Sequence, residues 1–335
     1  MHKIIASIKA KNKNPVGPLR YDEAVRALLC MLPMMVAIFA GQSAYVVALG
    51  QGGFFVSSLF LPARLRARFV MGAILIGIGL GFYLIGGTVA SYPLMAIFFT
   101  FLIGFNLSFL SSWKIGGPLA LTFIMIYTSG LNTGSAAKAS QNFFVFAFVM
   151  LWSMAISMLP IWKGTPVPPV NDKMSNEDYA EQGVRMGIGS SLALGISYLF
   201  GFAKLGWAPS AAGNIIRYDP KLSRKRAWAR AFGTIGGALL ALVTMLITLN
   251  PNILAVMALA FGVLNGLFKM RVLGQMPLFY TATILVLYSL NDLGNRVIIT
   301  ERVLFNIVGI IVAMCVVIYP FPRLMRMLRG QPKTV

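Results

Sequence analysis

The sequence has few of the side chains on which soluble enzymes rely. Among its 335 residues it holds one histidine, His2, and two cysteines, Cys30 and Cys315. A single histidine excludes histidine-based catalysis and every metal site that needs more than one imidazole. Both cysteines lie in apolar segments, so they predict neither a disulfide framework nor a zinc site. We therefore expect no enzyme, no metal and no cofactor.

Charge is also scarce, and acids are the scarcer sign. Charged residues make up 11% of the chain against 58% hydrophobic residues, and only nine are Asp or Glu. Because soluble domains carry about 25% charged residues, the composition indicates an integral membrane protein. No acid falls in the middle of an apolar segment, whereas a proton-coupled carrier usually needs an ionisable group there. The chain also lacks a G-x-x-x-x-G-K-[ST] loop, so we do not expect it to hydrolyse ATP.

Long apolar segments are what the chain has in abundance. A helix needs roughly 20 residues to cross a bilayer, and we count about twelve candidate segments. They lie near 24–40, 44–61, 69–87, 93–110, 115–131 and 140–161, and then near 182–203, 207–217, 229–249, 252–268, 272–290 and 301–320. The segment at 207–217 is too short to span and contains Pro209 and Gly213. The sequence therefore predicts an all-α integral membrane fold with one short or broken helix.

The segments form two similar sets of six. Arg68 and Arg230 lie 162 residues apart, and Pro160 and Pro320, which close the two sets, lie 160 apart. Each arginine precedes an apolar stretch with a G-x-x-x-G pattern, Gly77 with Gly81 and Gly233 with Gly237. We predict a basic leader at 1–23, repeats at 24–161 and 182–320, a linker at 162–181 and a basic tail at 321–335. Because each repeat has an even number of segments, the repeats are expected to be parallel.

Basic residues predict the orientation. The chain has 29 Lys and Arg and a formal net charge of +20. With the N-terminus inside, only four of them fall on the outer side: Lys138, Lys204, Arg296 and Arg302. This is the positive-inside pattern, so both termini are expected to be cytoplasmic. The same distribution favours membrane lipid over nucleic acid as a partner. In the linker, Ser175 with Asp178 predicts a helix start.

Seven side chains are candidates for a substrate site. Arg26 and Arg185 occupy equivalent positions, each one turn after an acid, and are either anchors at the cytoplasmic interface or a symmetric pair beside an anion path. Arg68 and Arg230 open the glycine-rich segments, whose glycines favour tight packing against another helix. Arg230 either belongs to that packing or binds an anion, because a broken helix beside it frees dipole ends that can meet one. Tyr45 and Trp207 start equivalent segments as belt residues or as an aromatic wall. Asn214 is an intramembrane amide that either joins helices or lines a path.

One stretch resembles a known family. Trp207-Ala208, a basic loop, and then Arg230 followed by Gly233, Thr234, Gly236 and Gly237 are similar to the fusaric acid resistance superfamily, which includes bacterial aromatic acid exporters and plant aluminium-activated malate channels. The likeness covers about 185–320. The first repeat matches in outline, with Tyr45 in place of the tryptophan and Met71-Gly72 after Arg68. The linker and tail are short, so the chain resembles a compact member that lacks the cytoplasmic domains.

The resemblance implies an efflux transporter of the bacterial inner membrane for organic anions, aromatic acids among them, that works with a periplasmic membrane-fusion adaptor. A passive organic-anion channel and a non-transporting membrane scaffold are the alternatives. The sequence allows a homo-oligomer. Substrate identity and the coupling ion are not encoded in any pattern that we find.

Overall fold

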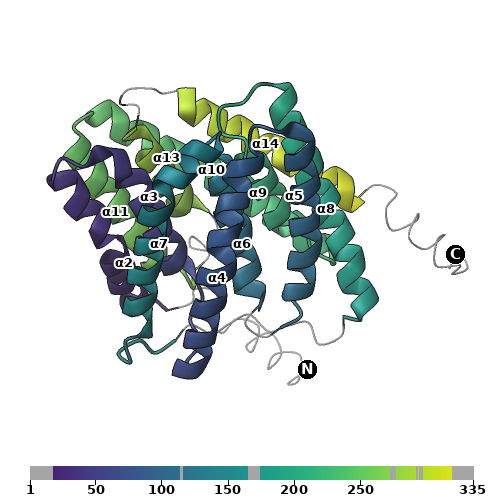
Figure 1. Ribbon diagram of the computed structural model, residues 1–335, viewed down its shortest axis with the longest axis horizontal. Coiled ribbons are helices and arrows are strands. Elements are labelled where there is room, and N and C mark those ends of the chain that lie inside the picture. The colour runs from purple at the N-terminus through teal and green to yellow at the C-terminus, as the bar shows by residue number, and fades with distance from the viewer. Residues whose placement is uncertain are drawn as a thin grey trace, which may run out of the picture.

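The computed structural model describes residues 18–113, 116–164, 174–271, 277–291, 293 and 297–318, and in these ranges it has twelve helices and no strand (Figure 1). The first half of the chain forms α2 (Tyr21–Phe39), α3 (Ser43–Ser58), α4 (Leu65–Val89), α5 (Pro93–Leu110), α6 (Gly116–Leu131) and α7 (Ala136–Met158). The second half forms α8 (Asn176–Leu199), α9 (Trp207–Ile215), α10 (Pro220–Ile247), α11 (Pro251–Leu267), α13 (Leu278–Ser289) and α14 (Val297–Ile318). The predicted all-α class is confirmed. Most of the leader, part of the linker and the whole predicted tail lie outside the described residues.

Five helices are long and apolar enough to cross a membrane: α4, α5, α7, α10 and α14. The helices α11 and α13 and most of α6 are apolar but shorter. The predicted short segment is α9, whose nine residues rise only about 13 Å at 1.5 Å per residue. That all twelve helices cross the bilayer stays a prediction.

Local sequence signals set several helix starts. Ser175 and Asp178 form the predicted capping box at the start of α8. Proline occupies the first helical position of α5, α10 and α11, where its missing N–H has no partner to lose. The side chain of Asp219 caps α10 by accepting from Lys221 N. As a result α10 starts at Pro220, before the apolar segment predicted at 229–249, and Arg230 lies about 15 Å along the helix axis from its first residue.

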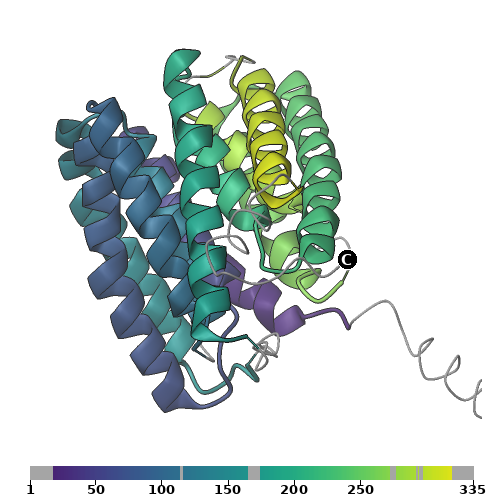
Figure 2. The same cartoon turned by 90° about the vertical axis from the view of Figure 1, so that its right-hand side faces the viewer.

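Helices of the two halves pack in the same order. In the first half α2 packs on α3, α3 on α7, and α4 on both α6 and α7. In the second half α8 packs on α9, α9 on α14, and α10 on both α13 and α14. The halves interlock because α5 lies along α8 and α11 lies along α2. Figure 2 shows the blue helices of the first half beside the green and yellow helices of the second.

Close helix contacts depend on glycines at particular positions. A Cβ on Gly233 would collide with Pro277, and one on Gly237 would collide with the carbonyl oxygen of Leu278, so α10 and α13 touch backbone to backbone. In the first half, Gly77 and Gly81 have nothing within 4 Å of an added Cβ. The contact of α4 with α6 instead uses Gly86, on a different face of the helix and nearer its end. The G-x-x-x-G pattern of α4 thus faces open space and does not mark the helix contact expected there.

Candidate functional site

Two buried arginines lie close together between α10 and α14. Arg230 is 8% exposed and Arg302 is 2% exposed, and their positive charges are near enough to repel each other. Arg230 Nε donates to Asn306 Oδ1 at 2.9 Å, and Asn306 Nδ2 donates to the carbonyl oxygen of Arg302 at 2.8 Å. Across the part of the chain that the structure describes, neither guanidinium forms an ion pair with a carboxylate.

Several buried polar atoms at this point have no partner. Within the described residues, Arg230 Nη2, Arg302 Nε and Thr234 Oγ1 are buried without a hydrogen bond. Thr234 lies one turn beyond Arg230 on α10. An unsatisfied buried donor costs about 1–3 kcal/mol, and more when it is charged. A cluster with this much uncompensated positive charge is therefore suited to an anionic ligand that supplies the missing acceptors.

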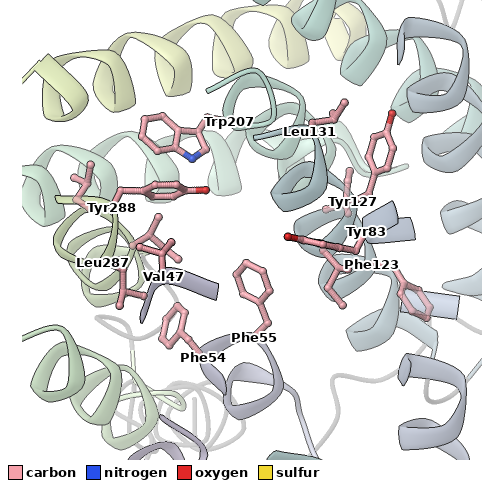
Figure 3. Packing of buried hydrophobic residues seen from close by; sticks show 14 of the residues in the cluster. Val47, Phe54, Phe55, Tyr83, Phe123, Tyr127, Leu131, Trp207, Leu287 and Tyr288 are labelled. Carbon is pink, nitrogen blue, oxygen red and sulfur yellow. The ribbon is translucent and has the colours of Figure 1, made fainter. Parts of the chain in front are cut away.

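Aromatic rings surround the Arg302 guanidinium. Its central carbon lies 4.7 Å from the centroid of the Trp207 ring, a cation–π geometry. Trp207 in turn meets Tyr288 edge to face, with centroids 5.5 Å apart, and Phe305 at 5.6 Å. Figure 3 shows Trp207 and Tyr288 one above the other across the core. Tyr280 neighbours both arginines. The two guanidinium groups thus lie among aromatic rings, and the tyrosines add polar hydroxyl groups.

A small polar pocket connects this cluster to the first half of the chain. Its volume is about 20 Å³, which is room for roughly one water molecule. Ser129 Oγ donates to Gln51 Oε1 at 2.6 Å, and Asn132 Nδ2 donates to the Tyr288 hydroxyl at 3.3 Å. These side chains and Arg302 all line the pocket. The site therefore lies where α3 and α6 of the first half meet α9, α13 and α14 of the second.

Arg26, a predicted candidate, does not join this site. It is fully buried and pairs with Glu23. Its guanidinium also donates to the carbonyl oxygens of Val56, Ser57 and Leu59 and to Ser157 Oγ. Arg26 thus caps the carbonyl end of α3, and its hydrogen bonds are made to groups of the protein itself.

Arg185 and Arg68 have comparable roles. Arg185 pairs with Glu181 and donates to the Tyr218 carbonyl oxygen at 3.3 Å, although its Nε has no partner. Arg68 donates to the carbonyl oxygens of Pro62 at 2.7 Å and Trp162 at 2.6 Å. Both side chains therefore bind chain segments that leave helices.

Tyr45 and Asn214 also lie apart from the arginine cluster. Tyr45 is 40% exposed in the first turn of α3. Asn214 donates back to the Ser210 carbonyl oxygen at 2.8 Å within α9. Neither residue lines the polar pocket. Of the seven candidates, the structure brings together Trp207 and Arg230.

The carbonyl end of the short helix α9 is already occupied. Arg217 Nη1 donates to the Gly213 carbonyl oxygen at 3.2 Å, and Arg226 Nη1 donates to that of Asn214 at 3.3 Å. The partial negative charge at the carbonyl end of α9 is therefore compensated by the chain's own cations.

Arg302 and Asn306 were not among the predicted site residues. Arg302 was expected on the outer side because the apolar segment there begins near 301. The structure starts α14 at Val297, so Arg302 lies inside the helix, and Asn306 follows one turn later on the same face. The available signal was this i, i+4 pair of polar residues in an otherwise apolar helix.

Comparison with protein families places this region. Residues 192–316 match the model of a family described as fusaric acid resistance protein-like. The resemblance is confirmed over this segment. It contains Trp207, Arg230, Arg302 and Asn306, so the centre of the site lies inside the matched region. Comparisons with curated proteins and with solved structures found no match. The five long apolar helices and the match together indicate a multi-pass membrane protein that resembles a transport family over this segment.

Proposed function

We propose that this protein moves organic anions across the bacterial inner membrane, outward from the cytoplasm, through the site formed by Arg230 and Arg302. The observation that carries the proposal is the pair of buried arginines without a carboxylate partner in the described structure. A buried charge without a partner costs several kcal/mol. The two charges are compensated when an anionic ligand binds between them, and this explains why a transport protein would keep them buried.

The chemistry of the site suits a carboxylate attached to an apolar or aromatic body. A guanidinium presents its donors in a planar fork that matches the two oxygens of a carboxylate. Arg230 Nη2 and Arg302 Nε are the donors left open. Trp207, Tyr280 and Tyr288 supply rings beside them, and offset or edge-to-face contacts with an aromatic substrate add about 0.5–1.5 kcal/mol each. Aromatic acids are therefore the substrates that we expect.

We further propose twelve crossings arranged as two parallel repeats, with both termini cytoplasmic. Equivalent contacts support the two repeats. Arg26 pairs with Glu23 and donates to the Val56 carbonyl oxygen. Likewise, Arg185 pairs with Glu181 and donates to the Tyr218 carbonyl oxygen. The same packing order in both halves supports it as well.

In this orientation α10 runs outward and α14 runs inward, so cations follow one another through the second half. Arg217 and Arg226 lie near the cytoplasmic end, Arg230 deeper, and Arg302 nearer the outside. Lys204, in the loop before α9, lies 4.8 Å above the Tyr288 ring, and burial lowers its pKa. An anion that crosses meets a positive charge at each level, which offsets the loss of its hydration.

The water-sized pocket favours a gated carrier over an open pore. An anion of aromatic size does not fit about 20 Å³, so the path is closed in this conformation and substrate passage needs a rearrangement of the helices around it. The passive channel is the second candidate. It is favoured because, among the described residues, no carboxylate that a proton could occupy pairs with either arginine. A periplasmic adaptor remains a proposed partner, and self-association a proposed state.

Transport in vesicles tests the proposal. The purified full-length chain is reconstituted into liposomes, and efflux of a fluorescent aromatic carboxylate is measured for Arg302→Gln, Arg302→Lys and the control Arg66→Gln, whose side chain is exposed. We expect loss in the first, partial activity in the second and full activity in the control. Full activity of Arg302→Gln would remove the site from the path. Reversal potentials that follow the anion gradient alone would favour the channel.

A further inference from the structure

A second concave surface lies along α10 and α14, and its lining does not include the two arginines of the cluster. It is a groove of about 410 Å³, lined within the described residues by Arg224, Ala227, Trp228, Ala231, Ile310 and Met314. This volume falls in the range of ligand sites, roughly 300–1,000 Å³. Small residues on α10 and an intermediate burial of Ile310 and Met314 on α14 leave the space between the helices unfilled.

The groove has one charged end and an apolar body. Trp228 is 60% exposed and stacks on Phe232, itself 59% exposed, with ring centroids 5.7 Å apart. Arg224, exposed, lies one turn before Trp228, at the end of the groove nearest the start of α10. The first two turns of α10 carry four cations and no acid: Lys221, Arg224, Lys225 and Arg226. In the proposed orientation this end faces the cytoplasmic leaflet.

We infer that the groove binds an anionic phospholipid of the cytoplasmic leaflet, with an acyl chain along Trp228, Ile310 and Met314 and the headgroup phosphate on Arg224. The complementarity is twofold, since the body of the groove is apolar and its membrane-surface end is cationic. Anionic headgroups attract basic side chains by about 1 kcal/mol per Lys or Arg near the surface. The occupant is thus a lipid that the surrounding membrane supplies continuously, and not the transported anion.

The position gives the bound lipid a route to influence transport. Ala227 and Ala231 flank Arg230 on α10, and Ile310 lies one turn from Asn306 on α14. A lipid that fills the groove contacts the same two helices that the Arg230–Asn306 hydrogen bond joins. We therefore expect anionic lipid to steady the spacing of α10 and α14. The inference rests on the proposed orientation, while its test does not depend on transport.

Quenching of Trp228 by lipids with brominated acyl chains tests the inference on the full-length protein. The protein is placed in phosphatidylcholine vesicles that contain a fixed minor fraction of brominated lipid, either phosphatidylglycerol or phosphatidylcholine. The contribution of Trp228 is the difference between wild type and Trp228→Phe. Trp113 offers a matched control, because it is equally exposed at 59% but follows α5; its contribution comes from Trp113→Phe.

We expect brominated phosphatidylglycerol to quench Trp228 at least twofold more than brominated phosphatidylcholine at the same fraction, and Trp113 to show no such preference. Arg224→Gln should abolish the preference, whereas Lys225→Gln, which removes a neighbouring charge outside the groove, should keep it. Equal quenching of Trp228 by both lipids would reduce the groove to ordinary lipid contact. Absence of quenching by either would mean that a protein segment or a second copy covers it, which also overturns the inference.

Discussion

Substitution of Arg230 by methionine tests whether this arginine binds a ligand or stabilises the fold. In the structure Arg230 makes a hydrogen bond to Asn306 and leaves Nη2 without a partner. Arg26, also buried, pairs with Glu23 and donates to three carbonyl oxygens. The matched exchange Arg26→Met provides the comparison, because both changes remove a buried guanidinium and retain most of the apolar stem.

The two substitutions should change the free energy of unfolding in different ways. Arg26→Met breaks a buried pair and removes the donor to three carbonyl oxygens, although Glu23 keeps its contact with Lys269. It should therefore lower the free energy of unfolding by about 3–5 kcal/mol. Arg230→Met loses a hydrogen bond worth about 1.5–3 kcal/mol to a charged donor, but it also removes a buried charge whose desolvation costs several kcal/mol. Its stability should stay level or rise. Binding of a carboxylate should weaken by a similar 1.5–3 kcal/mol, roughly 10- to 100-fold.

Thermal unfolding of the purified variants in detergent, without added organic anion, measures the first quantity. Efflux per molecule in vesicles measures the second. A site arginine gives a stable protein with impaired transport, and a structural arginine gives an unstable protein with normal transport per folded molecule. If Arg230→Met unfolds as readily as Arg26→Met and transports normally once folded, the reasoning about Arg230 is wrong.

Three further predictions concern packing, titration and topology. Gly237→Ala should destabilise α10 against α13, whereas Gly77→Ala should be neutral because its Cβ has open space; thermal unfolding of the two decides. Burial lowers the pKa of Lys269, in the loop after α11, from 10.5 to about 7, so the unfolded chain binds the extra proton between these values and stability should rise with pH across that window. Lys269→Met should flatten this rise in unfolding scans, and an unchanged slope would show that other groups cause it. Reporter fusions after Gly164 and Val335 should both indicate the cytoplasm, and an external signal at either excludes parallel repeats of six crossings.

The helices were predictable from the sequence because long apolar runs and their turns are local signals. The capping box at Ser175 and the short helix at Trp207 were also readable, since each depends on a few adjacent residues. The start of α10 was not, because the cationic first turns resemble a loop on a hydropathy scale, while Asp219 and Pro220 begin the helix through capping. Hydropathy thus placed Arg230 at a surface where the structure places it well inside a helix.

The composition of the site depended on tertiary contacts that spacing does not reveal. Arg26, Arg68 and Arg230 share one sequence character, a cation at the edge of an apolar segment. The structure separates them by their partners: Glu23 and carbonyl oxygens for Arg26, carbonyl oxygens for Arg68, and Asn306 for Arg230. The contact of Arg302 with Trp207 was not predictable for a related reason, since the two residues lie 95 positions apart along the chain.

Equilibrium binding of an aromatic carboxylate to the purified protein tests the central claim, an anion held by Arg230 and Arg302, most directly. Titration calorimetry is performed with the carboxylate and with its uncharged carboxamide, which has nearly the same shape. We predict that wild type binds the carboxylate and not the amide, that Arg230→Gln combined with Arg302→Gln abolishes binding, and that Arg66→Gln leaves it intact. Equal binding of carboxylate and amide, or undiminished binding by the double variant, would contradict the account.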